Sequence, residues 1–580
     1  MRKCLLASAV ALVFIFSVTW AARAADDQTL AEKLLEVMRA NHQITEAQYK
    51  ELKKEAEKEK AAMAAQARQT QAAETQAAQE AQAAQAAQAQ VAKAPAAKPA
   101  PNALQATWNN GLRLTSEDKA FDVHIGGRIQ LDVADAEAND ALNVWANKQL
   151  SPGLNGPKVD GFGDQVRRAR LAIDGTLWKD IEFISQIEFA PTYTTSTVLS
   201  SSAKFTAFGS KASAEYFRNL TTGYAVSFQD LWVGVKDIPY LGRFKVGQMY
   251  EPISIEQMTS DNWNTFMEKA LPMNALVPTR NLGFEVQNTI CDDRLGWMVG
   301  YFFAQQVSTP YNGVAVDGTA DLFSPHLEDT DAAVRVTGLP WYEDNGAKLL
   351  HIGIGYEHKF RSDSTSSTNP GWLDLKTYPE GYMFSPMVDT GYFTAKGMNV
   401  IDPEIALVYG PFSVQAEYTW AFANNVMPAF TNGNTGLPAA GVTKDNASFS
   451  GWYAYASYFL TGEHRPYNKT PSTSDYQATF GRVIPNCNFN PSSGGFGAWE
   501  VAFRVSNVDL NDTAAGFNGG NETDYTAGIN WYLNPNVMLK LNYVYATVGT
   551  HAAATLAKDG SPLFPMGHEN IVESRFQIAF

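Results

Sequence analysis

The sequence is poor in cysteine and in positive charge. Only three cysteines occur among 580 residues, and Cys4, Cys291 and Cys487 form no spacing of the C-x-x-C type that would indicate a metal site. Aspartate and glutamate number 60 against 45 lysines and arginines, so the formal net charge is −15. Because nucleic acid needs a basic surface, this balance argues against it as a partner. We therefore predict no metal, no cofactor and no nucleic-acid partner, and the pairing of Cys291 with Cys487 stays open.

Long apolar segments are also missing beyond the first residues. Residues 1–24 have the form of a signal peptide, with Arg2 and Lys3, an apolar run over 5–20 and an A-x-A site at 22–24. No other stretch of 18 apolar residues occurs, so any membrane-spanning part must consist of strands. We expect export from the cytoplasm, with a retained anchor as the alternative.

A helical arm is expected to follow. Apolar residues recur at helical spacing in 30–38, and Thr45 begins a capping box ahead of a second helix, so 25–60 is predicted to be a helical hairpin or coiled-coil segment. The segment 61–106 is rich in Ala and Gln and then in Pro, which is typical of a linker. The arm is either a weakly packed coiled coil between subunits or a semi-rigid spacer.

From residue 107 onward the dominant pattern is strict alternation of apolar and polar residues, which indicates strands with one face towards lipid. The last segment, 573–580, shows it clearly, since Phe576, Ile578 and Phe580 share one face. The sixteen predicted strands lie near 121–132, 168–177, 181–190, 226–237, 242–250, 280–290, 295–305, 330–338, 348–360, 402–410, 411–421, 448–460, 498–507, 522–533, 536–547 and 569–580.

The connections between these strands alternate in length. Short turns such as 291–294 and 534–536 alternate with long polar linkers such as 191–225 and 508–521, and this asymmetry is typical of outer-membrane barrels. One connection, 461–497, is long on the short-turn side, so it either enters the pore or indicates a wrong count. The predicted fold class is all-β: a sixteen-stranded antiparallel transmembrane β-barrel over 107–580, with an N-terminal helical or coiled-coil periplasmic extension.

Several segments, in order, carry a family likeness. RFKVGQMYEPISIEQMTSDNWNTFMEKALP begins at Arg243 and is followed by Arg280-Asn281-Leu282-Gly283; the other matching segments are 127–131, 167–170, 458–463, 498–500 and 530–536. This pattern resembles the phosphate-selective porin O and P family from about residue 121 to 580. The resemblance implies a porin, usually a homotrimer, whose third long loop folds into the lumen as a constriction.

A sixteen-stranded barrel leaves a water-filled lumen, so the predicted function is passive diffusion of small hydrophilic solutes or ions, with a preference for anions such as phosphate implied by the resemblance. Inward parity and the family pattern select the candidates for pore-lining or anion-binding residues: Arg128, Arg168, Arg170, Lys236, Arg243, Lys245 and Arg280. The candidates in the constriction loop are Glu251, Glu256, Asp261, Glu268 and Lys269. These arginines either bind anions or pair with the loop.

Phe576, Ile578 and Phe580 are the predicted assembly signal, because they resemble the terminal signature read by the outer-membrane assembly machinery. The expected location is the outer membrane of a diderm bacterium, in contact with its lipid and with the arm in the periplasm. The alternative function is a structural protein whose arm tethers the envelope to the cell wall, with the channel secondary. No catalytic pattern such as G-x-S-x-G beside a strand-to-helix turn favours an enzyme.

Overall fold

The structure, a computed structural model, divides into two units at residues 100 and 101. The described residues of the second unit are 104–143, 161–190, 226–303, 329–361, 372–381, 383, 386–390, 393–428, 445–549 and 567–580. In the first unit only Glu46, Lys50, Lys53 and Lys54 are described, all helical and exposed. The predicted signal peptide at 1–24 lies outside the described residues, and the arm and linker remain predictions.

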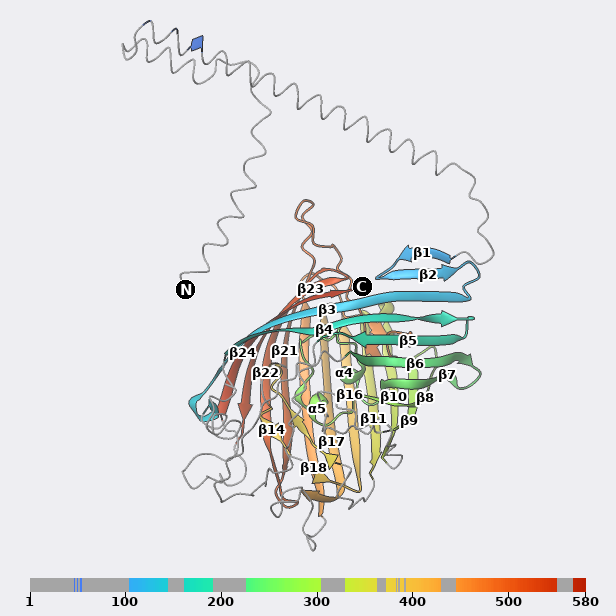
Figure 1. Cartoon of the computed structure of the whole chain (residues 1–580), viewed down its shortest axis with the longest axis vertical. Helices are drawn as coiled ribbons and strands as arrows, with labels where there is room; N and C mark the ends of the chain where they lie inside the picture. The colour runs from blue at the N-terminus through green and yellow to red at the C-terminus, as the bar shows by residue number, and fades with distance from the viewer. Residues whose placement is uncertain are drawn as a thin grey trace. The chain divides into compact units, whose positions relative to one another are not determined.

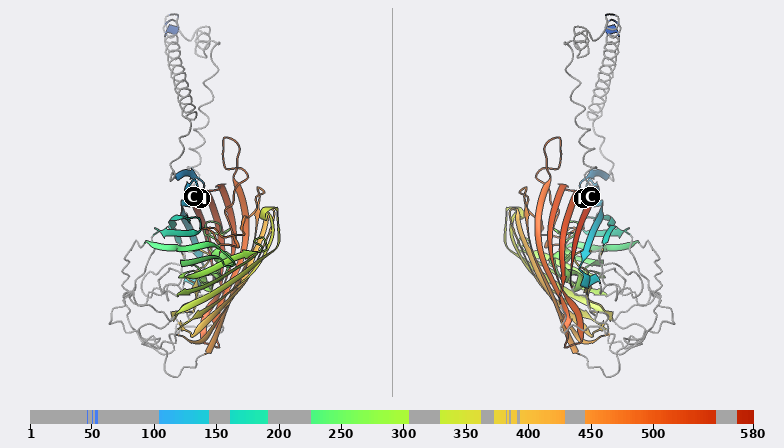
Figure 2. Two further views of the ribbon diagram at one scale, coloured as in Figure 1. Left: turned by 90° about the vertical axis from the view of Figure 1, so that its right-hand side faces the viewer. Right: turned by 90° about the vertical axis from the view of Figure 1, so that its left-hand side faces the viewer.

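Sixteen antiparallel strands of the second unit close into a barrel (Figures 1 and 2). They are β3 (Phe121–Ala138), β4 (Gly161–Leu177), β5 (Ile181–Glu188), β6 (Ser227–Ile238), β7 (Gly242–Tyr250), β8 (Arg280–Ile290), β9 (Leu295–Phe303), β10 (Thr330–Glu343), β11 (Lys348–Phe360), β16 (Gly397–Tyr409), β17 (Phe412–Pro428), β18 (Asp445–Phe459), β21 (Ala498–Asp512), β22 (Phe517–Asn534), β23 (Val537–Val548) and β24 (Gly567–Ala579). Each predicted strand overlaps one of these, so the predicted fold class of the barrel is confirmed.

The last strand closes the sheet on the first. β24 pairs with β3, with Phe576 opposite Leu131 and Ile578 opposite Ile129. Successive residues of β24 alternate in burial: Phe576 is 37% exposed, while its neighbours Arg575 and Gln577 are buried. This is the expected pattern of a strand with one face towards lipid and one towards the lumen. Among the described residues, no helix is both long and apolar enough to cross a membrane.

The strands extend further than their apolar patterns indicated. The prediction of a long linker at 508–521 is wrong. β21 continues to Asp512 and β22 begins at Phe517, so only a four-residue turn separates them. Asn511 pairs with Asn518 in this extension. Polar residues such as these show no alternation of hydropathy, so their ladder hydrogen bonds leave no signal in the sequence.

A hairpin of β1 (Leu104–Trp108) and β2 (Leu112–Ser116) precedes the barrel and was not predicted. β1 begins inside the segment 61–106 that was predicted to be linker. β2 pairs with β3 next to the C-terminal residue, in agreement with Figure 1. Phe580 exchanges backbone hydrogen bonds of 2.9 and 2.7 Å with Gly127, and its ring stacks on Trp108 with the centroids 6.3 Å apart. The hairpin therefore covers the end of the closing strand.

At least three connections fold into the barrel within the part of the chain that the structure describes. The third loop, 251–279, holds α4 (Ile255–Met258) and α5 (Leu271–Ala275). A fifth loop between β11 and β16 contributes β12 (Trp372–Leu373), β13 (Lys376–Thr377), β14 (Val388–Asp389) and β15 (Phe393–Thr394). The inner connection, 460–497 between β18 and β21, holds β19 (Tyr467–Asn468) and β20 (Thr479–Phe480). A 3-10 turn, η1 (Asp344–Gly346), joins β10 to β11.

The third loop crosses the lumen from β7 to the far wall. Almost all of its side chains are buried. Its backbone carbonyls accept hydrogen bonds from three inward side chains of that wall: Gln130 of β3 to Asp261, Gln577 of β24 to Asn262, and Asn530 of β22 to Thr265. Such a path fits a constriction, as the family pattern implied.

Candidate functional site

The candidate pore-lining residues point into the barrel. Strand parity predicted this for all of them except Arg280, which was a candidate from the family pattern. Arg128, Arg168, Arg243 and Lys245 are buried, although they lie on a membrane-spanning wall whose alternate residues are exposed. Lys236 and Arg280 are partly exposed. The remaining candidate, Arg170, is also partly buried, and its guanidinium reaches the third loop.

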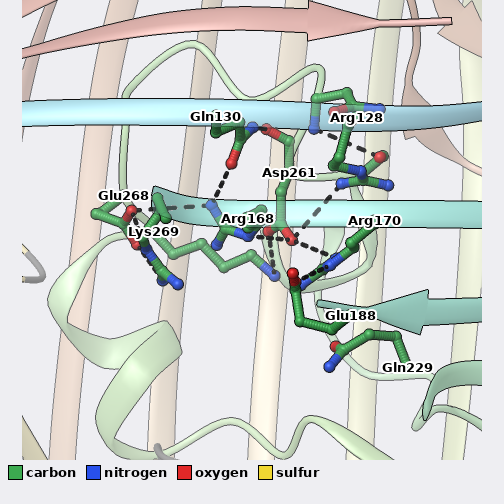
Figure 3. A network of polar contacts seen from close by, with 12 residues as sticks. Arg128, Gln130, Arg168, Arg170, Glu188, Gln229, Asp261, Glu268 and Lys269 are labelled. Carbon is green, nitrogen blue, oxygen red and sulfur yellow. Dashed lines mark hydrogen bonds and ion pairs between the residues drawn. The ribbon is translucent and has the colours of Figure 1, made fainter. Parts of the chain in front are cut away.

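Asp261 of the third loop lies at the centre of a cationic group (Figure 3). Its carboxylate is 3.2 Å from Arg168 Nε, 3.3 Å from Arg170 Nη1, 3.9 Å from Arg128 Nη1 and 3.9 Å from Lys269 Nζ. Burial raises the pKa of Asp261, but these four cations more than offset it and hold the pKa well below its ordinary value. The loop thus carries a carboxylate that is ionised at neutral pH into the arginine group.

Glu268 makes the second attachment of the loop to the same wall. Arg167 binds it through two hydrogen bonds of 2.9 and 3.0 Å, and Arg575 Nη2 lies 2.7 Å from its Oε1. Burial raises the pKa of Glu268, and Arg167, Arg168 and Arg575 outweigh that effect, so the pKa is lowered. Two bonds of 2.7 Å also join Arg575 to Asp132 of β3.

Arg167 and Arg575 are site residues that the sequence reasoning missed. A register shift in the ladder between β3 and β4 pairs Gln130 with Arg168 and Leu131 with Val166, so Arg167 of β4 has no partner in β3. Both Arg167 and Arg168 therefore reach the lumen. Strict parity therefore places Arg167 on the wrong face. Parity places Arg575 on the polar face of the last strand, whereas the predicted assembly signal lies on its apolar face.

The remaining constriction-loop candidates are also bound. Glu256 Oε1 lies 3.0 Å from Arg504 Nη1, and burial, ahead of the opposing effect of that arginine, raises the pKa of Glu256. Lys269 donates hydrogen bonds to both the backbone and the side-chain oxygen of Gln257. Glu251 accepts a 2.6 Å hydrogen bond from Asn281. Loop and wall are thus joined at several points.

Four other candidates pair with carboxylates of the wall. The separations are 2.7 Å for Arg243 with Glu182, 3.8 Å for Lys236 with Glu182, 2.6 Å for Lys245 with Glu285 and 2.8 Å for Arg280 with Asp230. These four cations are thus paired within the wall and not with the third loop, which was the partner expected from the sequence.

Pairing is incomplete around Asp261. Arg128 is 7% exposed, its Nη1 has no hydrogen-bond partner among the described residues, and its nearest carboxylate is the one at 3.9 Å. Lys540 of β23 donates to the backbone oxygens of Asn264 and Phe266 instead of to a carboxylate. Around the third loop, Arg128 and Lys540 are thus two cations that no carboxylate of the described residues binds closely.

The inner connection meets the third loop from the other side. Phe480 donates its backbone N–H to Thr259 Oγ1 at 3.3 Å, and Trp263 Nε1 donates to Asp475 at 3.3 Å. Arg465 of this connection donates to Gln415 Oε1 at 2.8 Å and to the Tyr455 hydroxyl, and no carboxylate of the described residues pairs with it. The long segment 461–497 therefore enters the pore, which was one of the two outcomes expected, and adds a further cation.

Comparison with known proteins finds similarity over most of the chain. A family model described as phosphate-selective porin O and P matches residues 123–580. Porin O of Pseudomonas aeruginosa is 24% identical over 457 residues, which cover 75% of this chain and 85% of that protein. An uncharacterized protein of Caulobacter vibrioides is also 24% identical, over 77% of this chain and 72% of its own length. Among solved structures, the outer membrane channel DcaP of Acinetobacter baumannii aligns with a TM-score of 0.41 at 12% identity, over 80% of this chain and 99% of DcaP.

Proposed function

This chain belongs to the phosphate-selective porin O and P family and is an outer-membrane channel, and we propose that its lumen favours small hydrophilic anions, phosphate among them. The observation that carries the proposal is the incompletely paired Arg128 beside the third loop. An anion that reached this guanidinium would gain a charge-assisted hydrogen bond without first displacing a closely bound carboxylate.

The surroundings of Arg128 favour an anion over a cation. Arg128, which lacks a close carboxylate, is enclosed by a protein wall of low dielectric constant, which strengthens the field within the lumen. Arginine also presents a planar set of donors that suits phosphate. Arg465 and Lys540 are two further cationic side chains in the constricted part of the lumen, and both bind neutral oxygens.

The formal charge of the whole chain does not oppose this preference. A net charge of −15 is a sum over all residues, whereas permeation responds to the charges at the narrowest point. The carboxylates of the third loop that lie in the arginine group are each bound to at least two cations. We propose that these carboxylates hold the loop and limit the affinity of the site for anions, so that a bound anion can leave.

Planar-bilayer recordings test the preference. Reversal potentials under a KCl gradient should show that chloride is favoured over potassium, and phosphate should reduce the chloride current. Arg128→Gln should weaken both effects. Arg243→Gln is the matched control, because Arg243 is also a buried wall arginine but is closely paired with Glu182. Cation preference of the wild-type channel would refute the proposal and leave the assignment as a channel intact.

We further propose that the protein is a homotrimer whose N-terminal arm lies in the periplasm after removal of the signal peptide at 1–24. In the barrel, β2 pairs with β3 at the end that carries Phe580 and the short turns. Short turns are periplasmic in outer-membrane barrels, so a chain that enters the barrel through β1 comes from that side. Protease added to intact cells should leave the arm uncut, and cutting from outside would contradict this orientation.

A further inference from the structure

Three buried carboxylates meet where the third loop leaves the wall. Glu251 follows β7 directly, Asp331 is the second residue of β10, and Glu357 lies in β11. In the β10–β11 ladder Asp331 pairs with Lys359, two residues beyond Glu357, so both carboxylates lie on the lumen face. All three residues are 0% exposed, and one oxygen from each lies within 4.8 Å of the others.

Each carboxylate uses only one of its two oxygens in a hydrogen bond. Glu251 Oε1 accepts from Asn281 at 2.6 Å, Glu357 Oε1 accepts from Lys359 at 2.6 Å, and Asp331 Oδ1 accepts from Arg361 at 2.7 Å. The second oxygen of each, Oε2 of both glutamates and Oδ2 of Asp331, is buried with no hydrogen-bond partner among the described residues. Lys359 Nζ lies 4.0 Å from Asp331 Oδ2, beyond hydrogen-bond distance. Three acceptors thus remain without a hydrogen bond within one small cluster.

Such an arrangement is unstable without a further positive charge. Lys359 and Arg361 supply two charges against three carboxylates, and Glu251 is bound only by a neutral amide. A buried carboxylate with an unsatisfied oxygen is costly, and the cost falls only if a proton or a cation joins it. Burial, followed by the charges of Glu357 and Asp331, raises the pKa of Glu251 well above its ordinary value.

We propose that Glu251, Asp331 and Glu357 bind a calcium ion. Carboxylate oxygens are the ligands that hard divalent cations prefer, and Ca²⁺ with ligand distances of about 2.3–2.6 Å can join oxygens up to about 5 Å apart. The oxygens of this cluster fall within that reach. Mg²⁺, at about 2.0–2.1 Å, spans only about 4 Å and demands stricter geometry. A single shared proton, the competing explanation, would satisfy one pair of oxygens and leave the third carboxylate as it is.

The ion would fasten the base of the third loop to β10 and β11. The other end of that base is already closed by the hydrogen bond of 3.1 Å from Glu251 N to Thr279 O. Calcium would therefore hold the loop at its root, on the opposite side of the lumen from the attachments of Asp261 and Glu268 to β3, β4 and β24. This role does not depend on which ions the pore prefers.

Isothermal titration of the full-length protein with CaCl₂ tests the site. The protein is purified in detergent, treated with EDTA and dialysed. Wild type should bind one Ca²⁺ per chain with a dissociation constant of roughly 10⁻⁴–10⁻³ M, as weak extracellular sites do. Glu357→Gln, which keeps the shape of the side chain, should weaken binding at least about tenfold, the effect of losing one of three charged ligands.

Glu522→Gln is the matched control, because Glu522 is likewise a fully buried wall carboxylate with unpartnered oxygens but lies outside the cluster. It should bind calcium as wild type does. Heat-modifiable migration on gels shows whether each variant is folded, and Asp331→Asn replaces Glu357→Gln if the latter is not. No binding by wild type in the millimolar range overturns the proposal and supports the shared proton. Equal binding by wild type and folded Glu357→Gln places the calcium elsewhere, for instance on co-purified lipopolysaccharide, and overturns it as well.

Discussion

Asp261→Asn is the substitution that separates anion binding from simple pairing. Asparagine keeps the shape of the side chain but removes the carboxylate that Arg128, Arg168 and Arg170 share. Glu188 remains on Arg170, and Glu268 remains near Arg168. The group of cations around residue 261 then gains one unit of positive charge. If the arginines serve only to hold the loop, the change loosens the constriction. If the arginines attract anions, the substitution strengthens anion binding.

The size of the effect follows from Coulomb's law. An anion about 4 Å from the Asp261 carboxylate is repelled by about 1 kcal/mol in water and by about 4 kcal/mol at an effective dielectric constant of about 20. Even the smaller figure corresponds to roughly a fivefold change in binding. We therefore expect phosphate to block the chloride current of Asp261→Asn at a concentration at least about fivefold lower than in wild type.

The assay is a phosphate titration of single-channel chloride current in planar bilayers. Glu285→Gln is the control, since it also removes a buried lumenal carboxylate, but one bound closely to Lys245 alone. It should shift the block much less. The loop should stay in place in Asp261→Asn because Glu268 remains bound to Arg167 and Arg575. An unchanged phosphate block, with an unchanged reversal potential, would refute the reasoning.

Three further predictions concern the loop and the closing strand. Arg575→Gln breaks a buried contact with both Asp132 and Glu268, so thermal unfolding should show a loss of about 3–5 kcal/mol, and a loss below that of Arg128→Gln would contradict it. Because the pKa values of Asp261 and Glu268 are lowered on folding, their contribution to loop docking is present above the ordinary carboxyl values of about 3.9 and 4.3 and is lost only as pH falls below them. Because Glu251 and Glu256 of the same loop have raised pKa values, the test uses a Glu251→Gln, Glu256→Gln double variant. Its current noise should be constant from about pH 8 to 5 and rise in more acid solution, and a rise near neutrality would count against this. Deletion of Phe580, which exchanges two hydrogen bonds with Gly127, should reduce the amount of folded protein in the outer membrane far more than the conductance of the channels that do insert; normal levels of inserted protein would contradict this.

Strand parity predicted correctly which face of the wall most of the candidate residues occupy, but it did not predict their contacts in the lumen. It placed Arg128, Arg168 and Lys245 on the inner face because lipid on one side and solvent on the other impose a period of two on every strand. It failed for Arg167, where the register of β3 and β4 shifts by one residue. Such a shift depends on local backbone geometry and leaves no mark in the hydropathy pattern.

The partners of each charge could not be predicted from the sequence. Asp261 was a candidate because of its loop, but its position among three arginines depends on how that loop crosses the lumen. The cluster of Glu251, Asp331 and Glu357 comes from a loop and two strands that are distant in the chain, so it has no ligand spacing to recognise. The hairpin of β1 and β2 was missed because two five-residue strands are too short for a periodicity to stand out.

The most direct test of the account is to locate the anion itself. Crystals of the protein soaked in bromide, which replaces chloride and scatters anomalously, should show a bromide peak in contact with the Arg128 guanidinium, and phosphate should displace it. Anomalous density that is absent from the lumen, or that lies only beside closely paired arginines such as Arg243, would contradict the claim that incomplete pairing creates the anion site.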